Sequence, residues 1–431
     1  MAIDLFIHNI GDLATVAGPG NSPRRGPALR NAARIAGGAL AIANGQIVAL
    51  GREKSVRRDL VLAAQTPMVD AQGGAVTPGF VDPHTHLVFA GTREQEYAIR
   101  VAGGSYEEIL AAGGGINQTR SLTQAASEDA LIATTLPHLQ RMLAHGTTTV
   151  EAKSGYGLDV ANELKLLRVA RRLATAQPIE IVSTFLGAHL VPVEYRHDPA
   201  AYVDLIIDKM LPAVVAEGLA DYCDVWCDEG IFDRAQSARI LTAARAAGLG
   251  LRLHANQLGA GEGTRLAVEL GAASVDHLER LPPAQIPLLA ASDTIAVLVP
   301  GVAFASGGPQ ADARALIDAG AAVALATDFN PGSCYTESMP MIMALACNEM
   351  AMTPTEALVA ATFNAACSLG RASRVGSLEV GKQADLVLWS VPNIESIPYH
   401  FGVNRVDRLF KAGRLVVEGG QPITTPSRQS G

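Results

Sequence analysis

Eight short apolar runs, each ending in polar or ionisable residues and followed by an Ala- and Leu-rich stretch, succeed one another through the middle of the chain. They cover residues 75–82, 147–153, 179–185, 223–227, 250–254, 274–277, 294–299 and 322–328. Short β-branched runs are typical of buried strands, and the longer stretches between them are typical of helices. The alternation predicts an α/β fold in which eight parallel strands close into a (β/α)8 TIM-like barrel. A doubly wound sheet is disfavoured, because no Gly-rich phosphate loop follows the first strand.

The two ends of the chain carry a different pattern. Short alternating runs, separated by Asn-Gly or Gly, occur at residues 39–50, 385–389 and 414–417. Such runs are typical of hairpin strands without intervening helices. We therefore expect residues 1–77, together with 376–431, to form one small β-sandwich domain. Residues 78–375 would then form the catalytic barrel domain beside it.

Composition and charge exclude several classes of function. Of the 431 residues 48% are hydrophobic, and 34 Lys and Arg against 42 Asp and Glu give a net charge of −8. No basic patch stands out, so we expect no binding to nucleic acid. No apolar stretch is long enough to span a bilayer, and the N-terminus lacks the pattern of a signal peptide, so we expect no membrane partner. Five scattered cysteines fit reduced thiols in a cytoplasmic protein better than a disulfide framework.

Histidines and an aspartate close three of the eight runs. His84 and His86 follow the first run at a spacing of two, which places both imidazoles on one face of a strand. His254 closes the fifth run and Asp328 the eighth, and these strand ends share one mouth of a closed barrel. Alone, Asp328 could cap a helix, and His254 could be a hydrogen-bonded core residue. Together the four predict the ligands of one divalent metal, with a position left for water.

These residues and their contexts resemble the amidohydrolase superfamily, which shares the His-x-His motif, histidines that end strands five and six, and an Asp that ends strand eight. The segment 376–386 also resembles that superfamily's return to its sandwich domain. Within the superfamily the chain is similar to the imidazolonepropionase family over nearly its whole length. The segments that carry this similarity are residues 84–93, 151–158, 185–189, 254–258 and 327–333. A longer loop at residues 17–38 departs from the family, and we expect it to lie in the sandwich without touching the chemistry.

The resemblance implies a hydrolase of L-histidine degradation that opens the ring of 4-imidazolone-5-propanoate and gives N-formimidoyl-L-glutamate. It also implies a homodimer. The ion would be Zn2+ or Fe2+, because His and carboxylate ligands suit both, and it would lower the pKa of the attacking water. Members with two metals usually carry a carbamylated Lys at the end of strand four, where this chain has none. Lys153 instead ends the second run, so one metal per chain is expected.

Asp328 and His277 are the predicted catalytic residues. Asp328 would take the proton of the water and pass it to the leaving nitrogen, while also serving as a metal ligand. His277 ends the sixth run, where it could donate a hydrogen bond to the developing oxyanion. The alternative for His277 is a buried structural role, with a hydrogen bond to Asp276 or to a backbone carbonyl.

The predicted substrate-binding residues lie near the strand ends. They are Arg93, Tyr156, His189, Gln257, Asn330, Gly332 and Ser333. Arg93 offers a planar fork that matches the propionate of the implied substrate, unless it is a surface arginine without a partner. Backbone N–H groups of the turn from Asn330 to Ser333 could hold an anionic group, or the turn could merely position Asp328.

Gln257 discriminates among related reactions. Superfamily deaminases typically carry Glu three residues after the strand-five His, and Gln cannot ionise to shuttle protons. The alternatives left open are another mononuclear amidohydrolase acting on a carboxylate-bearing cyclic amide and, with less support, a deaminase. A metal-free barrel that serves as a binding module would have lost one of the four ligands, and this chain retains them all. Tyr106 and the glycines at 113–115 could form a lid, although a helix end explains the glycines nearly as well.

Overall fold

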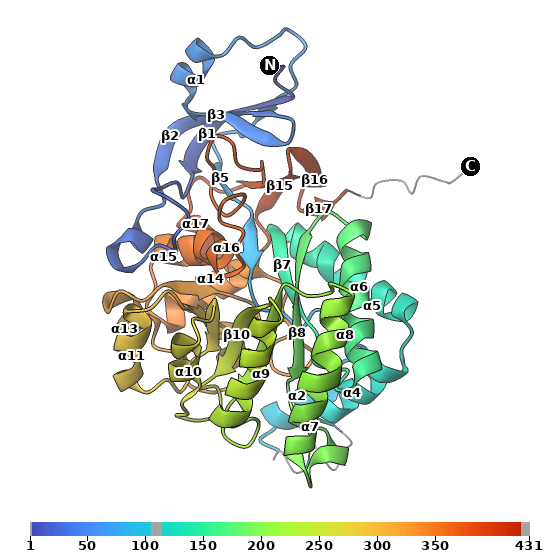
Figure 1. Cartoon of the computed structure of the whole chain (residues 1–431). Helices are drawn as coiled ribbons and strands as arrows, with labels where there is room; N and C mark the ends of the chain where they lie inside the picture. The colour runs from blue at the N-terminus through green and yellow to red at the C-terminus, as the bar shows by residue number, and fades with distance from the viewer. Residues whose placement is uncertain (1, 105–107, 109–113, 424–431) are drawn as a thin grey trace, which may run out of the picture.

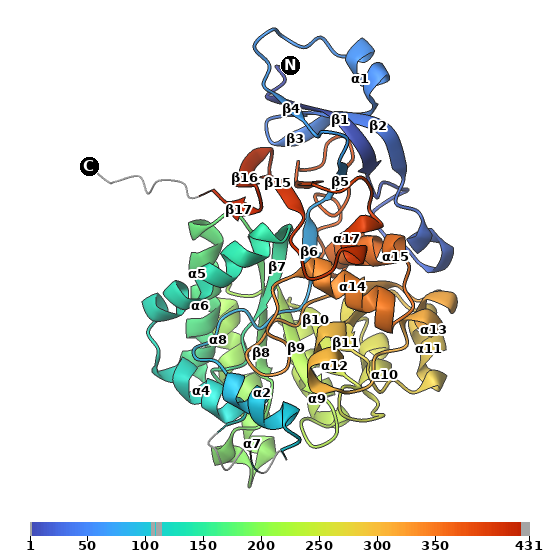
Figure 2. The ribbon, with the colours of Figure 1, turned by 180° about the vertical axis from the view of Figure 1, so that it is seen from behind.

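The computed structural model of the protein describes residues 2–104, 108 and 114–423. Figures 1 and 2 show a strand barrel surrounded by helices, with a smaller sheet at one end of it. The strands nearest both ends of the described chain lie in that smaller sheet.

The barrel consists of eight strands in chain order, and each ladder between neighbours is parallel. The strands are β6 (Phe80–Asp82), β7 (Thr147–Lys153), β8 (Glu180–Ala188), β9 (Tyr222–Cys227), β10 (Gly250–Ala255), β11 (Ser274–His277), β12 (Ile295–Leu298) and β13 (Val323–Leu325). The (β/α)8 fold predicted from the sequence is confirmed.

The barrel closes through the residues that follow its first and last strands. Thr85 forms a parallel bridge with Phe329, although neither lies in a named strand. The Asp328 N–H donates to the His84 carbonyl at 3.0 Å, and the His86 N–H donates to the Phe329 carbonyl at 2.9 Å. Closure of the barrel therefore brings the His-x-His segment directly beside Asp328.

Helices cover the outside of the barrel and join its strands (Figure 1). They are α2 (Glu94–Val101), α4 (Ile116–Ala125), α5 (Glu128–Ala144), α6 (Val160–Ala176), α7 (Pro199–Leu205), α8 (Leu211–Ala216), α9 (Arg234–Ala246), α10 (Gly263–Glu269), α11 (Ile286–Ala290), α12 (Pro300–Ser306), α13 (Ala313–Asp318), α14 (Met339–Glu349), α15 (Pro354–Val359), α16 (Ala365–Ser368) and α17 (Ser396–Tyr399). Helix α1 (Glu53–Asp59) instead packs against the smaller sheet. Short 3-10 or π-helical turns are η1 (Gly26–Arg30), η2 (Val193–Tyr195), η3 (Ile206–Met210), η4 (Pro283–Gln285) and η5 (Ala360–Asn364).

Helix α6 illustrates how the sequence specifies these elements. Asp159 caps its N-terminus by accepting from the Asn162 N–H at 2.9 Å. Leu166, Val169 and Leu173 recur at helical spacing and are buried, so they form a stripe that packs in the barrel core. Among the described residues, no helix is both long and apolar enough to cross a membrane.

The smaller sheet is mixed and joins both ends of the chain. Its strands are β1 (Leu5–Ala14), β2 (Arg34–Ala43), β3 (Gln46–Arg52), β4 (Met68–Asp70), β5 (Ala75–Pro78), β14 (Leu386–Trp389), β15 (Val406–Lys411), β16 (Arg414–Glu418) and β17 (Gln421–Pro422). Strand β5 pairs with β1 on one side and with β14 on the other. The predicted Asn-Gly hairpin joins β2 to β3, where Asn44 and Gly45 have φ angles of 51° and 74°.

The apolar run over residues 75–82 forms two strands, and the expectation of one continuous strand is wrong. The run divides at Gly79 between β5 in the smaller sheet and β6 in the barrel. A Cβ at Gly79 would lie 2.4 Å from the Thr148 side chain, so only glycine fits at this crossing. The His84–His86 segment therefore follows a strand of only three residues.

The loop over residues 17–38 also departs from expectation, because part of it packs on the barrel. The Arg24 N–H donates to Asn364 Oδ1 at 2.7 Å, and Arg25 bridges to Ala322, just before β13. These contacts lie at the N-terminal ends of the barrel strands, opposite the mouth that carries Asp328. The part from Arg34 onward enters β2, as expected for the smaller sheet.

Candidate metal centre

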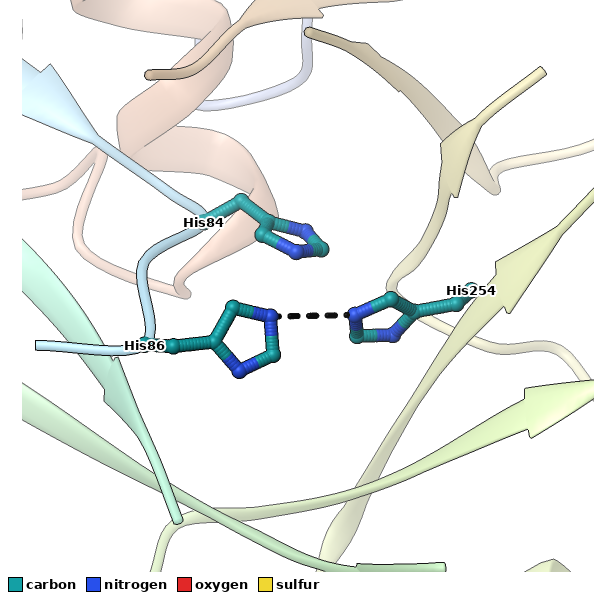
Figure 3. A group of neighbouring side chains, drawn as sticks. All are labelled: His84, His86 and His254. Atoms are coloured by element: carbon teal, nitrogen blue, oxygen red, sulfur yellow. Dashed lines mark hydrogen bonds between the residues drawn. The ribbon is translucent and has the colours of Figure 1, made fainter. Parts of the chain in front are cut away.

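The structure brings the four predicted metal ligands together at the C-terminal mouth of the barrel. The His84 Nε2 and His86 Nε2 atoms lie 3.4 and 3.5 Å from Asp328 Oδ1. The His254 Nε2 atom lies 3.4 Å from His86 Nε2. Figure 3 shows the three imidazoles converging from the segment after β6 and from β10. All four side chains are buried.

This donor set fits a divalent metal. His84 Nε2 and Asp328 Oδ1 are buried and have no hydrogen-bond partner among the described residues, which is a costly arrangement unless an ion satisfies them. Ligand atoms of a tetrahedral site with bonds of about 2.05 Å are about 3.3 Å apart, close to the spacings measured here. Burial lowers the pKa of both His84 and His86 well below its ordinary value, so both rings are neutral and can coordinate.

Two carboxylates behind the histidines fix their orientation. The His84 Nδ1 atom lies 2.7 Å from Asp276 Oδ2, and the His254 Nδ1 atom lies 3.1 Å from the Asp224 carboxylate. Each Nδ1–H donates to its carboxylate, which leaves each Nε2 lone pair for the ion. The sequence analysis did not identify Asp224 or assign Asp276 to His84. Each aspartate lies inside an apolar run of the sequence, and a carboxylate buried in a strand needs a hydrogen-bonding or charged partner.

Lys153 also lies in this buried layer, below the ligand histidines. Its ammonium contacts Asp224, Glu151 and Asp276, and Arg252 joins the same cluster from β10. Burial opposes its charge, but Asp224 and then Glu151 outweigh burial and raise the pKa of Lys153 above its ordinary value. The lysine that ends the second apolar run is therefore a buried cation.

His277 lies beside Asp328, as expected from its strand-end position. Its Nε2 is 4.0 Å from Asp328 Oδ2, and its Nδ1 is 3.2 Å from Glu279 Oε1. The ring's hydrogen-bond partner is thus Glu279, not Asp276 or a backbone carbonyl, and this changes the partner of the structural alternative without testing the role itself. His84, His277 and Asp328 also form a second group whose donor atoms could share an ion.

The pKa values of Asp328 and His277 are both raised above their ordinary values. Burial raises the pKa of Asp328 to about 7, against the opposing effect of His277. Burial opposes protonation of His277, but Glu279 and then Asp328 raise its pKa to about 9. A carboxyl group with a pKa near 7 is suited to exchanging protons at neutral pH.

Several residues of the site have positive φ angles, as do others elsewhere in the described chain. His277 and Asp328 have φ angles of 84° and 47°, and Leu278 and Asn256 are also positive, at 72° and 54°. Non-glycine residues rarely adopt these conformations, which cost about 1–3 kcal/mol each and cluster at active sites. Neither residue type signals such a conformation in the sequence.

Arg93 lies at the mouth but has a partner. Its Nε and Nη2 atoms donate to the Glu96 carboxylate at 2.8 and 2.7 Å, and Glu96 also accepts from the Gly115 N–H at 2.6 Å. The third nitrogen, Nη1, lies against Gly332, where an added Cβ would be only 2.1 Å away. The two predicted substrate contacts are thus in van der Waals contact, and glycine leaves the space for the guanidinium.

Tyr156 and His189 lie beside the ligand His86. The His189 ring stacks on His86 with centroids 4.8 Å apart, and the Tyr156 ring is 5.8 Å from His86. The Glu163 carboxylate accepts from the N–H groups of residues 155, 157 and 158, so it shapes the loop that carries Tyr156. Glu163 was not identified from the sequence, although a buried glutamate on the apolar side of α6 was its signal.

The Gln257 loop is held in a similar way. The Asp228 carboxylate accepts from the N–H groups of Gln257, Leu258 and Gly259 at 2.7–3.1 Å. Asp228 follows β9, one of the strand ends that the sequence analysis noted without a role. The half-buried Gln257 therefore lies on a loop whose backbone is hydrogen-bonded to the end of the neighbouring strand.

Hydrogen bonds of the Asn330 side chain hold the turn after Asp328. Asn330 Oδ1 accepts from the N–H groups of Gly332 and Ser333, both at 2.8 Å. The Asn330 amide donates to the Asp328 carbonyl at 2.7 Å and to Ser333 Oγ at 2.8 Å. These bonds favour the turn's second predicted role, positioning Asp328, and leave the Ser333 hydroxyl proton as the turn's available donor.

A cavity of about 540 Å3 opens beside this turn. Arg93, Gly332 and Ser333 line it, together with Tyr97 and Phe304. None of the four predicted ligands contributes to its lining. Tyr106 and Gly113, which were considered as parts of a lid, lie outside the described residues; Gly115 binds Glu96 as given above.

Comparisons with known proteins identify the family of the chain. Residues 75–416 match the model described as Amidohydrolase family. The chain is 49% identical over 421 residues to an imidazolonepropionase of Symbiobacterium thermophilum, covering 97% of this chain and 98% of the relative. It is also 49% identical over 418 residues to an imidazolonepropionase of Geobacillus kaustophilus, covering 97% and 99%.

Solved structures with similar folds are more distant in sequence. An adenosine deaminase from Xanthomonas campestris with bound zinc has a TM-score of 0.70 and 20% identity, covering 98% of this chain and 94% of that one. An atrazine chlorohydrolase from Arthrobacter aurescens complexed with zinc has a TM-score of 0.69 and 18% identity, covering 98% and 97%. At these identities the likeness shows the fold alone.

Proposed function

The chain belongs to the amidohydrolase family and, within it, to the imidazolonepropionase family, and we propose that it opens the ring of 4-imidazolone-5-propanoate by hydrolysis at this metal centre. The product is N-formimidoyl-L-glutamate, and the reaction is a step of L-histidine degradation. The observation that carries the proposal is the convergence of three imidazoles and one carboxylate in a chain about half identical to such enzymes.

We propose one divalent ion per chain, Zn2+ or Fe2+, held by His84, His86, His254 and Asp328. When bound, such an ion lowers the pKa of water from about 16 to about 7 and polarises the substrate carbonyl. The unpartnered His84 Nε2 and Asp328 Oδ1 atoms support this ligand set. A single ion is supported by Lys153, whose buried ammonium already neutralises the carboxylates below the histidines.

Asp328 is the proposed proton carrier. It accepts a proton from the attacking water and delivers it to the ring nitrogen, while the carbon–nitrogen bond breaks and the ring carbonyl becomes a carboxylate. His277 donates a hydrogen bond to the oxygen on which charge develops. Its Nε2, 4.0 Å from Asp328 Oδ2, can reach the same reacting group, and Glu279 keeps its Nδ1 side occupied.

Residues around the mouth bind the rest of the substrate. Arg93 Nη1 is proposed to pair with the propionate, since Glu96 holds its other edge. Ser333 lines the same cavity, and its Oγ can donate to the same carboxylate. Tyr156 and His189 are proposed to contact the substrate ring beside His86.

Gln257 and the turn complete the proposed binding site. Gln257 can hydrogen-bond a ring nitrogen or carbonyl without exchanging protons, which favours ring hydrolysis over deamination. Asn330 and Gly332 act mainly through the shape of the turn.

The family resemblance also supports a cytoplasmic homodimer, and analytical ultracentrifugation measures the subunit number directly.

The decisive experiment measures turnover of freshly prepared 4-imidazolone-5-propanoate by ultraviolet absorbance, with hydantoin and cytosine as control substrates. Metal is quantified in the same sample. Loss of the imidazolone absorbance with about one metal per chain supports the proposal. A metal-loaded enzyme that leaves the imidazolone unchanged would contradict it and would point to another cyclic amide that carries a carboxylate.

Replacing Arg93 by Ala is expected to raise KM more than tenfold with a smaller change in kcat. A charge-assisted pair with the propionate contributes about 1.5–3 kcal/mol, and its loss weakens binding in the ground state and the transition state alike. Steady-state kinetics measures both constants. Arg168→Ala removes an arginine with a similar two-point carboxylate partner on an outer helix and should leave KM unchanged. An unchanged KM for Arg93→Ala would remove Arg93 from the binding site.

Gly332→Ala tests whether the turn shapes the arginine site. The new methyl group would lie 2.1 Å from Arg93 Nη1, so the guanidinium must move, and we expect KM to rise about tenfold. Gly261→Ala is the control, because nothing lies within 4 Å of a Cβ added there. Equal KM values for the two variants would show that Arg93 does not need its observed position.

A further inference from the structure

Lys153 is a completely buried lysine whose role the proposed reaction leaves open. It ends β7, and its Nζ lies 2.6 Å from Asp224 Oδ2, 2.9 Å from Glu151 Oε2 and 3.5 Å from Asp276 Oδ2. Lys153, Asp224 and Asp276 come from β7, β9 and β11, which are alternate strands of the barrel. Side chains from alternate strands share one layer of a barrel interior, so a single ammonium can meet both aspartates.

The two aspartates that Lys153 joins are those that hold the metal-binding histidines. Asp276 holds His84, and Asp224 holds His254. The strand before His84 and the strand of His254 are first and fifth in the barrel order, and thus lie across the barrel from each other. Lys153 therefore connects the supports of two ligands that reach the metal centre from opposite walls.

Arg252 completes the cluster and anchors it to the backbone. Its Nε lies 2.9 Å from Glu151, and its Nη2 lies 3.4 Å from Asp276. The same guanidinium donates to the carbonyls of Pro83 at 2.7 Å and Ser368 at 3.0 Å. Because these carbonyls hold Arg252 in place, it cannot swing over to replace Lys153 at Asp224.

We propose that Lys153 is a positioning residue for the metal centre, whose ammonium holds Asp224 and Asp276 so that His254 and His84 present Nε2 to the ion. Without the ammonium, two buried carboxylates lose a shared counter-charge and must reorient or take up a proton. Either change weakens the hydrogen bonds to the histidine Nδ1 atoms, and loss of such supports typically costs 10–100-fold in metal affinity. The inference rests on the ligand set of the proposed function.

The test compares Zn2+ affinity in Lys153→Met and Lys411→Met. Lys411 is also a buried lysine, 2.6 Å from Asp385, but it lies in the smaller sheet. Competition with a chromophoric chelator measures the Kd, and thermal unfolding of the metal-free proteins measures stability. We expect Lys153→Met to raise the Kd 10–100-fold and Lys411→Met to lower stability without changing the Kd.

A double variant covers the case in which Lys153→Met does not fold. Lys153→Met combined with Glu151→Gln preserves the net charge of the cluster and still removes the link between Asp224 and Asp276. A Kd within threefold of wild type, in either folded variant, would overturn the proposal. The readout needs no substrate, so a wild-type enzyme that binds zinc but leaves the imidazolone intact would contradict the proposed reaction alone.

Discussion

Asp328→Asn is expected to lower kcat for ring opening at least about 1000-fold in a folded protein. Asparagine has nearly the same shape, but its amide cannot take up the proton of the attacking water. General acid–base catalysis contributes about 10²–10⁴ in rate, and Asp328 serves both proton transfers of the proposed reaction. The backbone should be unaffected, because asparagine tolerates the positive φ of 47° at this position.

The measurement must separate loss of the base from loss of a ligand. Rates are therefore expressed per bound metal, with the metal quantified in each sample. Asp385→Asn is a suitable control, since Asp385 is equally buried but lies next to the smaller sheet. A kcat per metal within tenfold of wild type in Asp328→Asn would exclude Asp328 as the proton carrier.

The convergence of His84, His86, His254 and Asp328 could be predicted because it depends on strand ends alone. Once eight parallel strands are recognised, His84, His254 and Asp328 must meet at one mouth, whatever the details of packing. Gly79 shows the limit of this reasoning. The first apolar run is divided between two sheets at Gly79, where the backbone comes close to Thr148. This contact depends on the folded structure and cannot be predicted from the residues of the run.

The supports of the site were harder to predict, because each depends on partners far apart in the chain. Asp224 lies 30 residues from His254, and Asp276 lies 192 residues from His84. An aspartate inside an apolar strand shows that a partner exists without showing which one it is. Glu96 differs, because its hydrogen bonds to Arg93 join residues only three positions apart, and only its bond to the Gly115 N–H, 19 residues away, depends on the fold.

Three buried carboxylates around the mouth act in the same way. Glu163 and Asp228 each accept hydrogen bonds from several backbone N–H groups of a mouth loop. Glu96 accepts one from a backbone N–H and others from the Arg93 guanidinium. Loops carry most of the proposed substrate contacts, and a carboxylate that binds several of a loop's donors restricts its conformations. Rigid placement matters because a shift of about 1 Å in a binding group can cost about 100-fold in rate. Buried acidic residues around the mouth, whether after a strand or in the first turn of a helix, therefore organise loops.

Removal of the metal should abolish turnover and lower the melting temperature. Without an ion, the His84 Nε2 and Asp328 Oδ1 atoms remain buried without a hydrogen-bond partner among the described residues. An ion present at about 1000 times its Kd stabilises the folded state by about 4 kcal/mol. For a chain of this length, that corresponds to roughly 5 °C in Tm.

The experiment treats the protein with a chelator, removes the chelator by dialysis and follows activity and Tm as Zn2+ or Fe2+ is returned. Both should recover together and reach a plateau near one equivalent per chain, because His84 belongs to both groups of donor atoms and the proposed ligands share one ion. A mock-treated sample controls for losses during dialysis. Full activity at less than about 0.1 metal per chain would contradict metal-dependent hydrolysis, and a plateau at two equivalents would contradict the single site. Recovery of Tm without activity would separate the two roles of the ion, since a cation can satisfy the buried donors without activating water.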